Sequence, residues 1–357
     1  MKTKAGNKNW GSNAITYGMV ILAYAVMQAM VMSGNISSLM KGLLVPLCMY
    51  VILAVSLNLT VGILGELSLG HAGFMCVGAF SSAVFSKCME GVIPNTMISF
   101  LIALVIGALA AAICGILIGI PVLRLRGDYL AIVTLAFGEI IKNIMNAIYL
   151  GLDSKGLHFS LKNAAALNLE EGGQVIIKGA QGITGTPKVS SFTIGVVLVL
   201  LTLFIIINLT NSRTGRAIMS IRDNRIAAES VGINITKYKL LAFTVSAALA
   251  GVAGVLYSHN VSSLTALPKN FGYNMSIMIL VFVVLGGIGN IRGSVIAAVV
   301  LTLLPELLRG LNNYRMLIYA IVLIAMMIFN SSPKAIALRS QIADNWKKKH
   351  SREKKEA

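Results

Sequence analysis

Ten apolar stretches separated by polar connections dominate the pattern of hydrophobic and polar positions. Because a helix needs roughly 20 apolar residues to cross a bilayer core, each stretch predicts a membrane span. The predicted spans are Ala14–Met32, Leu43–Val61, Leu67–Phe85, Ile98–Ile120, Tyr129–Leu150, Phe192–Leu209, Leu240–Tyr257, Met275–Leu285, Val295–Leu308 and Met316–Phe329. The last three are short, and glycines at 286–289 are typical of tilted, half-spanning or re-entrant segments. The pattern predicts an all-α polytopic membrane protein with about ten transmembrane helices, in a range of about 8 to 10.

Composition agrees with a membrane protein. Of the 357 residues, 56% are hydrophobic and 12% charged, and the mean hydropathy is +0.81. The net charge of +17 comes from 30 Lys and Arg against 13 Asp and Glu, with most of the excess in the two tails and in one loop. Basic segments beside membrane spans are expected from topology and from contact with anionic lipids, so lipids are expected partners and nucleic acid is not.

The distribution of basic residues predicts the topology and the division of the chain. Short cytoplasmic loops are rich in Lys and Arg, so we expect both termini and the pair Arg124/Arg126 in the cytoplasm. The expected parts are a basic N-terminus at 1–13, a transmembrane domain at 14–329 and a basic C-terminal tail at 330–357. Within the domain, 151–191 is an outer loop, interpreted as a lid or docking surface, and 210–239 is a cytoplasmic loop. Arg309 and Arg315 fall on the outer side and do not fit the rule.

The cytoplasmic loop has a pattern of its own. Asp223 or Asn224 is suited to cap a short helix, and Gly232 is suited to the left-handed turn that ends one. The helix between them carries an apolar row formed by Ile226, Ala227, Ala228 and Val231. Thr236 is expected to cap the next membrane helix. Since a simple connector needs neither caps nor an apolar row, the loop is interpreted as a docking element.

Recognisable catalytic and nucleotide motifs are missing from the sequence. It contains no P-loop, no HExxH, no GxSxG and no paired CxxC, so no catalytic residue, cofactor or metal site is predicted. The four cysteines, Cys48, Cys76, Cys88 and Cys114, are interpreted as small reduced hydrophobic residues. If the protein moves a solute uphill, the energy must therefore come from an ion gradient or from a partner.

Polar residues inside the predicted spans are candidates for a translocation pathway, since a charge at bilayer depth costs on the order of 3 kcal/mol. Glu139 lies near the middle of its span, with Lys142 and Asn143 on the same helix face. A sealed ion pair that only packs helices is the alternative interpretation. A second polar patch, in a glycine-rich stretch, contains the pathway candidates Asn58, Glu66, Ser68 and His71. For His71 a purely structural role is the alternative interpretation.

Small residues in two spans predict close helix packing. Gly115 and Gly119 form a GxxxG pair, and a second small face is formed by Ala247, Ala248, Gly251 and Gly254. These positions are interpreted as packing surfaces.

Three blocks of sequence together resemble a known family. They are LNLTVGILGELSLGHAGF at 57–74, LRGDYLAIVTLAFGEIIKNI at 125–144, and the long block from Ser212 through LGGIGNIRGSVIAAVVLTLLPELLR to Arg309. In order and spacing they resemble LivM-type permease subunits of branched-chain amino acid ABC importers. The resemblance implies a type II ABC importer-like fold in a bacterial inner membrane and a path for leucine, isoleucine and valine.

The resemblance also implies partners and coupling residues. The expected partners are a homologous second permease, two cytosolic ATP-binding subunits that hydrolyse ATP, and a periplasmic or lipid-anchored substrate-binding protein. The residues carried over as ATPase-coupling candidates are Gly215, Arg216, Arg222, Asp223, Ala227, Glu229 and Gly232. An extended insertion around 160–178 departs from the family pattern at the expected contact with the binding protein. A permease for urea or short-chain amides, and an ion-coupled transporter using Glu139, remain alternatives.

Overall fold

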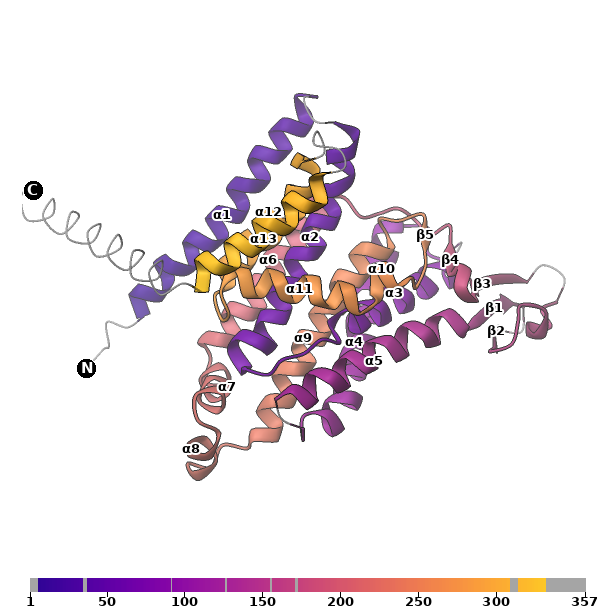
Figure 1. The fold of residues 1–357 in the computed structure, drawn as a ribbon. Helices are drawn as coiled ribbons and strands as arrows, with labels where there is room; N and C mark the ends of the chain where they lie inside the picture. Colours follow the sequence, from indigo (N-terminus) through magenta and orange to yellow (C-terminus); the bar gives the residue numbers. More distant parts are fainter. Residues whose placement is uncertain are drawn as a thin grey trace, which may run out of the picture. The chain divides into compact units, whose positions relative to one another are not determined.

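The computed structural model describes residues 6–34, 37–90, 92–125, 127–154, 156–170, 173–308 and 314–331. The chain divides into two units, Met1–Val299 and Val300–Ala357. The first unit contains α1 (Gly6–Met32) and the elements that follow up to α11, and the second contains α13 (Arg315–Ser331) (Figure 1). Helix α12 (Ile291–Leu307) crosses the boundary. Arg126, Arg309 and the tail from residue 332, all assigned a membrane side from sequence, lie outside the described residues.

The helices of the first unit follow the predicted spans. Their bounds are α2 Ser38–Asn58, continued by the π-helix η1 Leu59–Leu64, then α3 His71–Cys88, α4 Thr96–Val122, α5 Asp128–Ala147, α6 Phe192–Asn211, α7 Arg213–Asp223, α8 Arg225–Ser230, α9 Ile235–Ser258, α10 Pro268–Phe271 and α11 Tyr273–Gly286. Among the described residues, seven segments are long and apolar enough to cross a membrane: α1 from Ala14, α2 with η1, α4, α5, α6, α9, and α10 with α11.

The predicted polytopic, all-α fold class is confirmed, because all ten predicted spans overlap a helix. Three of these helices, α3, α12 and α13, are shorter or less apolar than the seven segments above. The estimate of about ten spans is therefore approximate but consistent with the structure.

Small residues determine how closely the central helices pack. Helix α9 packs against α2, α3 and α4. A Cβ atom added to Gly115 would lie 2.7 Å from the Cβ of Ala247, and one added to Gly251 would lie 2.6 Å from the Cβ of Ala111. A Cβ at Gly254 would collide with the carbonyl group of Met75. The two small faces predicted from sequence are confirmed as packing surfaces between α4 and α9, and the second also receives α3.

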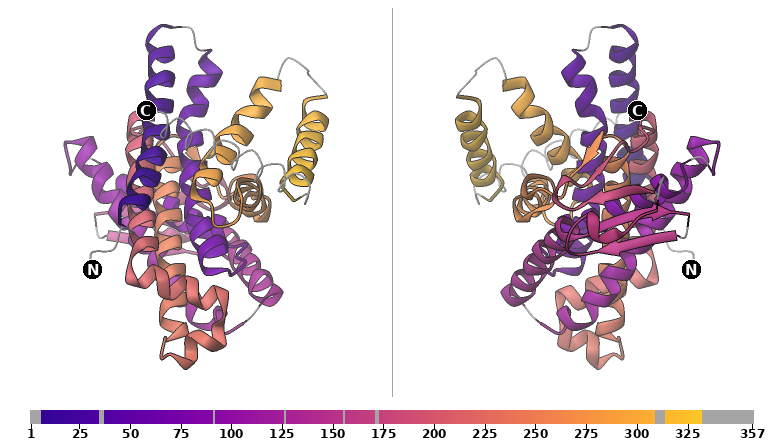
Figure 2. Two further views of the ribbon diagram at one scale, coloured as in Figure 1. Left: turned by 90° about the vertical axis from the view of Figure 1, so that its left-hand side faces the viewer. Right: turned by 90° about the vertical axis from the view of Figure 1, so that its right-hand side faces the viewer.

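The 151–191 segment contains strands that the sequence did not predict. Strands β1 (Tyr149–Asp153), β2 (Gly156–Ser160) and β3 (Gln174–Lys178) form an antiparallel sheet in the order β2-β1-β3, visible in the right-hand view of Figure 2. Further along, β4 (Ile183–Thr184) pairs with β5 (Ser263–Leu264). The predicted span Tyr129–Leu150 was too long, because its helix ends at Ala147 and the chain then enters β1.

Two short 3-10 helices, η2 (Ala165–Leu167) and η3 (Gly179–Gln181), complete this segment. Strands β1, β2 and β3 have only five residues each, and Gly151 lies in the middle of β1, so periodicity alone gives little signal.

Candidate functional site

The loop between α6 and α9 folds as two consecutive helices, each with a side-chain cap. The Asn224 side-chain oxygen accepts a hydrogen bond of 3.0 Å from the backbone N–H of Ala227 and so caps α8. Gly232 follows α8 with φ of +85°, the left-handed conformation that glycine adopts without strain. The predicted helix start and stop are therefore confirmed. The predicted cap at Thr236 was wrong, because Asn234 caps α9 by accepting from the N–H of Lys237.

The apolar row of α8 divides between two environments. Ala228 is buried in a small cluster with Ile221 of α7 and Ile235 of α9, which holds α8 against both neighbouring helices. Ile226 and Val231 point outward and are 80% and 74% exposed. Figure 1 shows α7 and α8 at the end of the first unit away from the sheet. Helix α8 and the Val231 that follows it thus present two large apolar side chains from a capped segment packed against α7 and α9.

The coupling candidates on α7 and α8 occupy different positions. Ala227, Glu229 and Gly232 are exposed around α8. Gly215 is buried at the joint of α6 and α7, where a Cβ would collide with the carbonyls of Leu209 and Thr210. Arg216 donates from Nη1 to the carbonyl of Asn211 at 3.2 Å.

Arg222, also a coupling candidate, contacts two different elements. Its Nε and Nη2 donate to Oδ1 of Asp223 at 3.1 and 2.9 Å, and its Nη1 donates to the carbonyl of Gly62 in η1 at 2.9 Å. The two bonds to Asp223 are local in sequence, whereas Gly62 lies 160 positions away, just beyond the end of the second predicted span. The side chain therefore joins α7 to the core of the first unit.

Two pathway candidates, Asn58 and Glu66, lie on either side of η1 and fasten it to other helices. Asn58 is fully buried; its side chain accepts from the N–H of Gly289 at 2.9 Å and donates to Oγ of Ser294 at 3.1 Å. Glu66 forms a largely buried ion pair with Lys239 of α9. The sequence singled out Asn58 and Glu66, but their partners are too distant along the chain to be read from spacing.

Two other pathway candidates lie close together in sequence: Ser68 precedes α3, and His71 is the first residue of that helix. His71 is buried, with Nε2 2.7 Å from Oγ of Ser56. Oγ of Ser68 is buried and has no hydrogen-bond partner among the described residues. The N–H of Ala72 donates to Oγ of Ser276 at 3.1 Å, which ties α3 to α11.

The remaining pathway candidates lie on α5. Glu139 pairs with Lys142, as the sequence spacing suggested, and also accepts a 2.8 Å hydrogen bond from the N–H of Tyr273 at the start of α11. The Lys142 side chain is buried, whereas Asn143 is exposed. The Glu139 carboxylate thus offsets the positive charge of the buried Lys142 ammonium group. It also accepts a hydrogen bond from a backbone N–H at the start of α11, where the helix itself supplies no acceptor. The N–H of Leu69 donates to Oγ1 of Thr134 on α5 at 3.0 Å, so the segment that holds Ser68 and His71 is bonded to α5.

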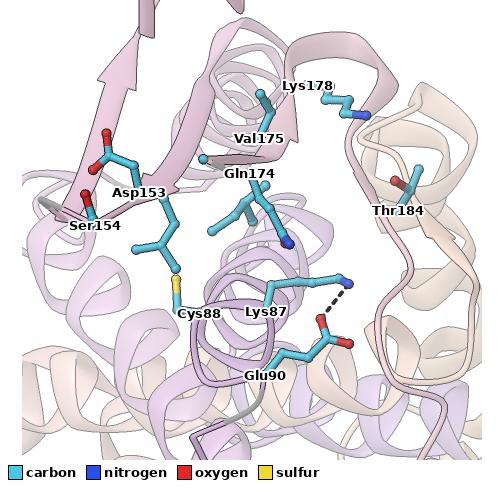
Figure 3. A pocket seen from close by; sticks show the side chains of 12 residues that line it. Lys87, Cys88, Glu90, Asp153, Ser154, Gln174, Val175, Lys178 and Thr184 are labelled. Carbon is cyan, nitrogen blue, oxygen red and sulfur yellow. Dashed lines mark hydrogen bonds and ion pairs between the residues drawn. The ribbon is translucent and has the colours of Figure 1, made fainter. Parts of the chain in front are cut away.

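A pocket of about 690 Å³ lies between the sheet and the end of α3 (Figure 3). Its lining is mostly polar, with lysine and carboxylate side chains from both elements. Lys87 and Glu90 form an ion pair of 2.8 Å on the α3 side, and Lys178 extends from the end of β3 on the other side. The pocket is far along the chain from the coupling candidates and was not predicted from sequence.

In the part of the chain that the structure describes, seven helical segments are long and apolar enough to cross a membrane, which defines a multi-pass membrane protein. The model of a protein family described as branched-chain amino acid transport system / permease component matches residues 39–329. The chain belongs to this family. The resemblance to LivM-type permeases that was drawn from three sequence blocks is thereby confirmed.

Individual relatives agree with the family match. The chain is 36% identical over 290 residues to the high-affinity branched-chain amino acid transport system permease protein LivM of Salmonella typhimurium, and equally to LivM of Escherichia coli. Both alignments cover 78% of this chain and 66% of the relative. LivH of Salmonella typhimurium is 30% identical over 129 residues, or 36% of this chain and 41% of its own length. No solved structure matches the chain.

Proposed function

We propose that this chain is the permease subunit of an ATP-driven importer and forms part of the path for leucine, isoleucine and valine across the bacterial inner membrane. Its partners are a homologous second permease, two cytosolic ATP-binding subunits that hydrolyse the ATP, and a periplasmic or lipid-anchored binding protein. The observation that carries the proposal is α8, a capped helix with Ile226 and Val231 exposed, in a chain of this permease family.

Coupling in this proposal follows from the rigidity of α8. The exposed apolar side chains insert into a groove of an ATP-binding subunit, and the burial of Ala228 against Ile221 and Ile235 prevents α8 from moving alone. When the ATP-binding subunits close, α8 moves with them and takes α7 and α9 along. The spans joined to these helices then shift between inward-facing and outward-facing arrangements.

The translocation path in this proposal runs along α5. Asn143 is exposed on a membrane span and Glu139 is part-exposed beside it. Polar groups facing lipid at this depth are costly, so a water-filled path or the second permease is the better neighbour for this face. The segment that holds Ser68 and His71 is bonded to the same helix through the contact of Leu69 with Thr134. Asn58 and Glu66 serve the path indirectly, by fixing η1.

The membrane sides follow from the positive-inside rule. The 1–13 and 330–357 segments and the 210–239 loop are cytoplasmic, and the 14–329 domain presents the 151–191 loop at the periplasmic face. That loop carries the sheet and the pocket beside Lys87 and Lys178, which supports a role as a docking surface for the binding protein.

The proposal is tested by purifying the tagged chain from its own cells and reconstituting what accompanies it. We expect a second permease and two ATP-binding subunits to co-purify, and leucine uptake into vesicles to require ATP. Competition with isoleucine and valine, and none with urea, identifies the substrate class. Co-purification of none of these subunits would overturn the proposal, and competition by urea alone would assign the chain to amide transport.

The same proposal makes substitutions in the coupling segment informative. Gly232→Val forces a bulky side chain into a left-handed conformation, and Arg222→Glu reverses a charge beside the carbonyl of Gly62. Both variants are expected to uncouple ATP hydrolysis from uptake while the protein still inserts into the membrane. Normal uptake per ATP in both variants would refute the coupling role.

A further inference from the structure

The end of the second membrane span carries an unusual turn. Helix α2 continues into η1, a buried π-helical turn, which Gly65 closes in a left-handed conformation with φ of +82°. The N–H groups of Gly65 and Glu66 both donate to the carbonyl of Thr60. Since the last carbonyls of any helix lack donors from the helix itself, the carbonyl of Gly62 is left for an outside donor. π-Helical turns are rare and often mark functional sites.

Both helices that flank α8 attach to this turn. Arg222, at the end of α7, supplies the outside donor by bonding the Gly62 carbonyl at 2.9 Å. Lys239, in the first turns of α9, pairs with Glu66 just beyond the turn, and the Lys239 and Glu66 side chains are only 5% and 15% exposed. A positive charge at the C-terminal end of a helix also matches the helix dipole. The helices on both sides of α8 are therefore bonded to this turn, one at Gly62 and one at Glu66.

A third segment lies against the same turn. Gly289, in the connection between α11 and α12, donates its N–H to Asn58 at 2.9 Å and has φ of +81°. A Cβ at Gly289 would lie 3.2 Å from the carbonyl oxygen of Gly62, so the two backbones touch with no side chain between them. The turn thus connects the α7–α9 segment to the glycine-rich 286–290 connection that sequence analysis noted.

We propose that Arg222 is a positioning residue that transmits movement of α8 to a joint formed by η1 and the α11–α12 connection, and that it is not itself a contact to the ATP-binding subunit. This inference rests on the proposed function, because it needs an ATP-binding subunit on α8. The guanidinium group suits the task since its planar fork bonds Asp223 and Gly62 together, whereas a lysine ammonium is a single point charge. The π-helical turn is the element whose arrangement Arg222 biases.

Hydrogen exchange on the purified chain tests the joint without any partner. Arg222→Ala is expected to speed amide exchange in 62–66 and in 287–290 together by about tenfold or more, because a charge-assisted hydrogen bond is lost. Arg222→Lys keeps the charge and is expected to speed exchange in the same two segments by a smaller factor. Arg213→Ala, an exposed arginine on the same helix, is the matched control and is expected to change neither segment. Unchanged exchange in both segments in the two Arg222 variants would overturn the proposal.

A second measurement separates positioning from docking. In reconstituted complexes, Arg222→Ala and Arg222→Lys are expected to retain the ATP-binding subunits and to lose leucine uptake per ATP hydrolysed. Loss of those subunits with normal exchange at 62–66 would make Arg222 a docking residue and would refute the inference. If the wild-type chain binds no ATP-binding subunit, the proposed function fails, while the exchange result still reports on the joint.

Discussion

Glu139 and Lys142 show at the scale of single residues how a charged pair is accommodated in a membrane span. The Lys142 side chain is buried, and Glu139 compensates it while also accepting from the N–H of Tyr273. Removing one member of a buried pair leaves the other charge without compensation, which is more costly than removing both. The pair is therefore a stability element whether or not a substrate passes beside it.

This asymmetry gives a direct prediction. Glu139→Gln is expected to destabilise the protein by about 3 kcal/mol, and the double variant Glu139→Gln/Lys142→Gln is expected to be more stable than Glu139→Gln alone. The measurement is the unfolding midpoint in mixed micelles titrated with a denaturing detergent. Strictly additive losses in the double variant would show that the two side chains do not interact.

Gly254 is a residue-scale test of the packing between α3 and α9. A Cβ there would collide with the carbonyl of Met75 and lie 2.8 Å from the N of Ala79, and these are backbone atoms that cannot turn aside. Gly254→Val is expected to destabilise the protein by about 1–3 kcal/mol, the usual cost of overpacking a core. Gly18→Val is the matched control, because a Cβ at Gly18 meets nothing within 4 Å. Equal thermal stability of both variants in detergent would contradict the packing described here.

At the scale of elements, α8 has only six residues and depends on its cap. Asn224→Ala removes the acceptor for the N–H of Ala227, at an expected cost of about 1 kcal/mol, while Asn224→Asp preserves an acceptor. Binding of ATP-binding subunits is expected to weaken several-fold in Asn224→Ala and to stay near wild type in Asn224→Asp. A titration of each reconstituted variant with ATP-binding subunits measures the two affinities. Equal weakening in both variants would show that loss of the cap does not cause the weaker binding.

Elements with long apolar runs or local caps could be predicted from the sequence. Each of the ten apolar stretches overlaps a helix. Asn224 caps the start of α8, and Gly232 adopts the left-handed conformation after its end, as these residue types favour. The cap at Asn234 was missed because Thr236 is also a good capping residue and only the backbone geometry decides between them. The sheet was missed because each of its strands has only five residues, too few for a clear apolar alternation.

Contacts between distant segments could not be predicted in the same way. Asn58 and Glu66 were singled out as polar residues in an apolar region, yet their bonds to Gly289 and Lys239 are set by tertiary packing. Arg222 was expected to work in the loop, and its bond to Gly62 spans 160 positions in sequence. Periodicity and capping rules describe neighbours within one element, so the joint at η1 has no sequence signal of its own.

At the scale of the whole molecule, the proposed topology separates two surfaces. Ser230 on α8 is expected in the cytoplasm and Leu161, after β2, in the periplasm, and both are exposed. In a variant whose native cysteines are replaced by alanine, a cysteine at position 161 is expected to react with an impermeant maleimide in right-side-out vesicles, and a cysteine at position 230 only in inverted ones. The reverse pattern would invert the topology.

The central claim is that ATP-binding subunits drive transport through α8, and leucine uptake into proteoliposomes tests it most directly. The vesicles contain the chain, its partners and internal ATP, and Ile226→Asp is compared with wild type because it places a charge on the exposed apolar face of α8. The expected result is uptake that needs ATP, persists with a protonophore and falls to background in Ile226→Asp. Uptake that proceeds without ATP-binding subunits and collapses with the protonophore would contradict the claim.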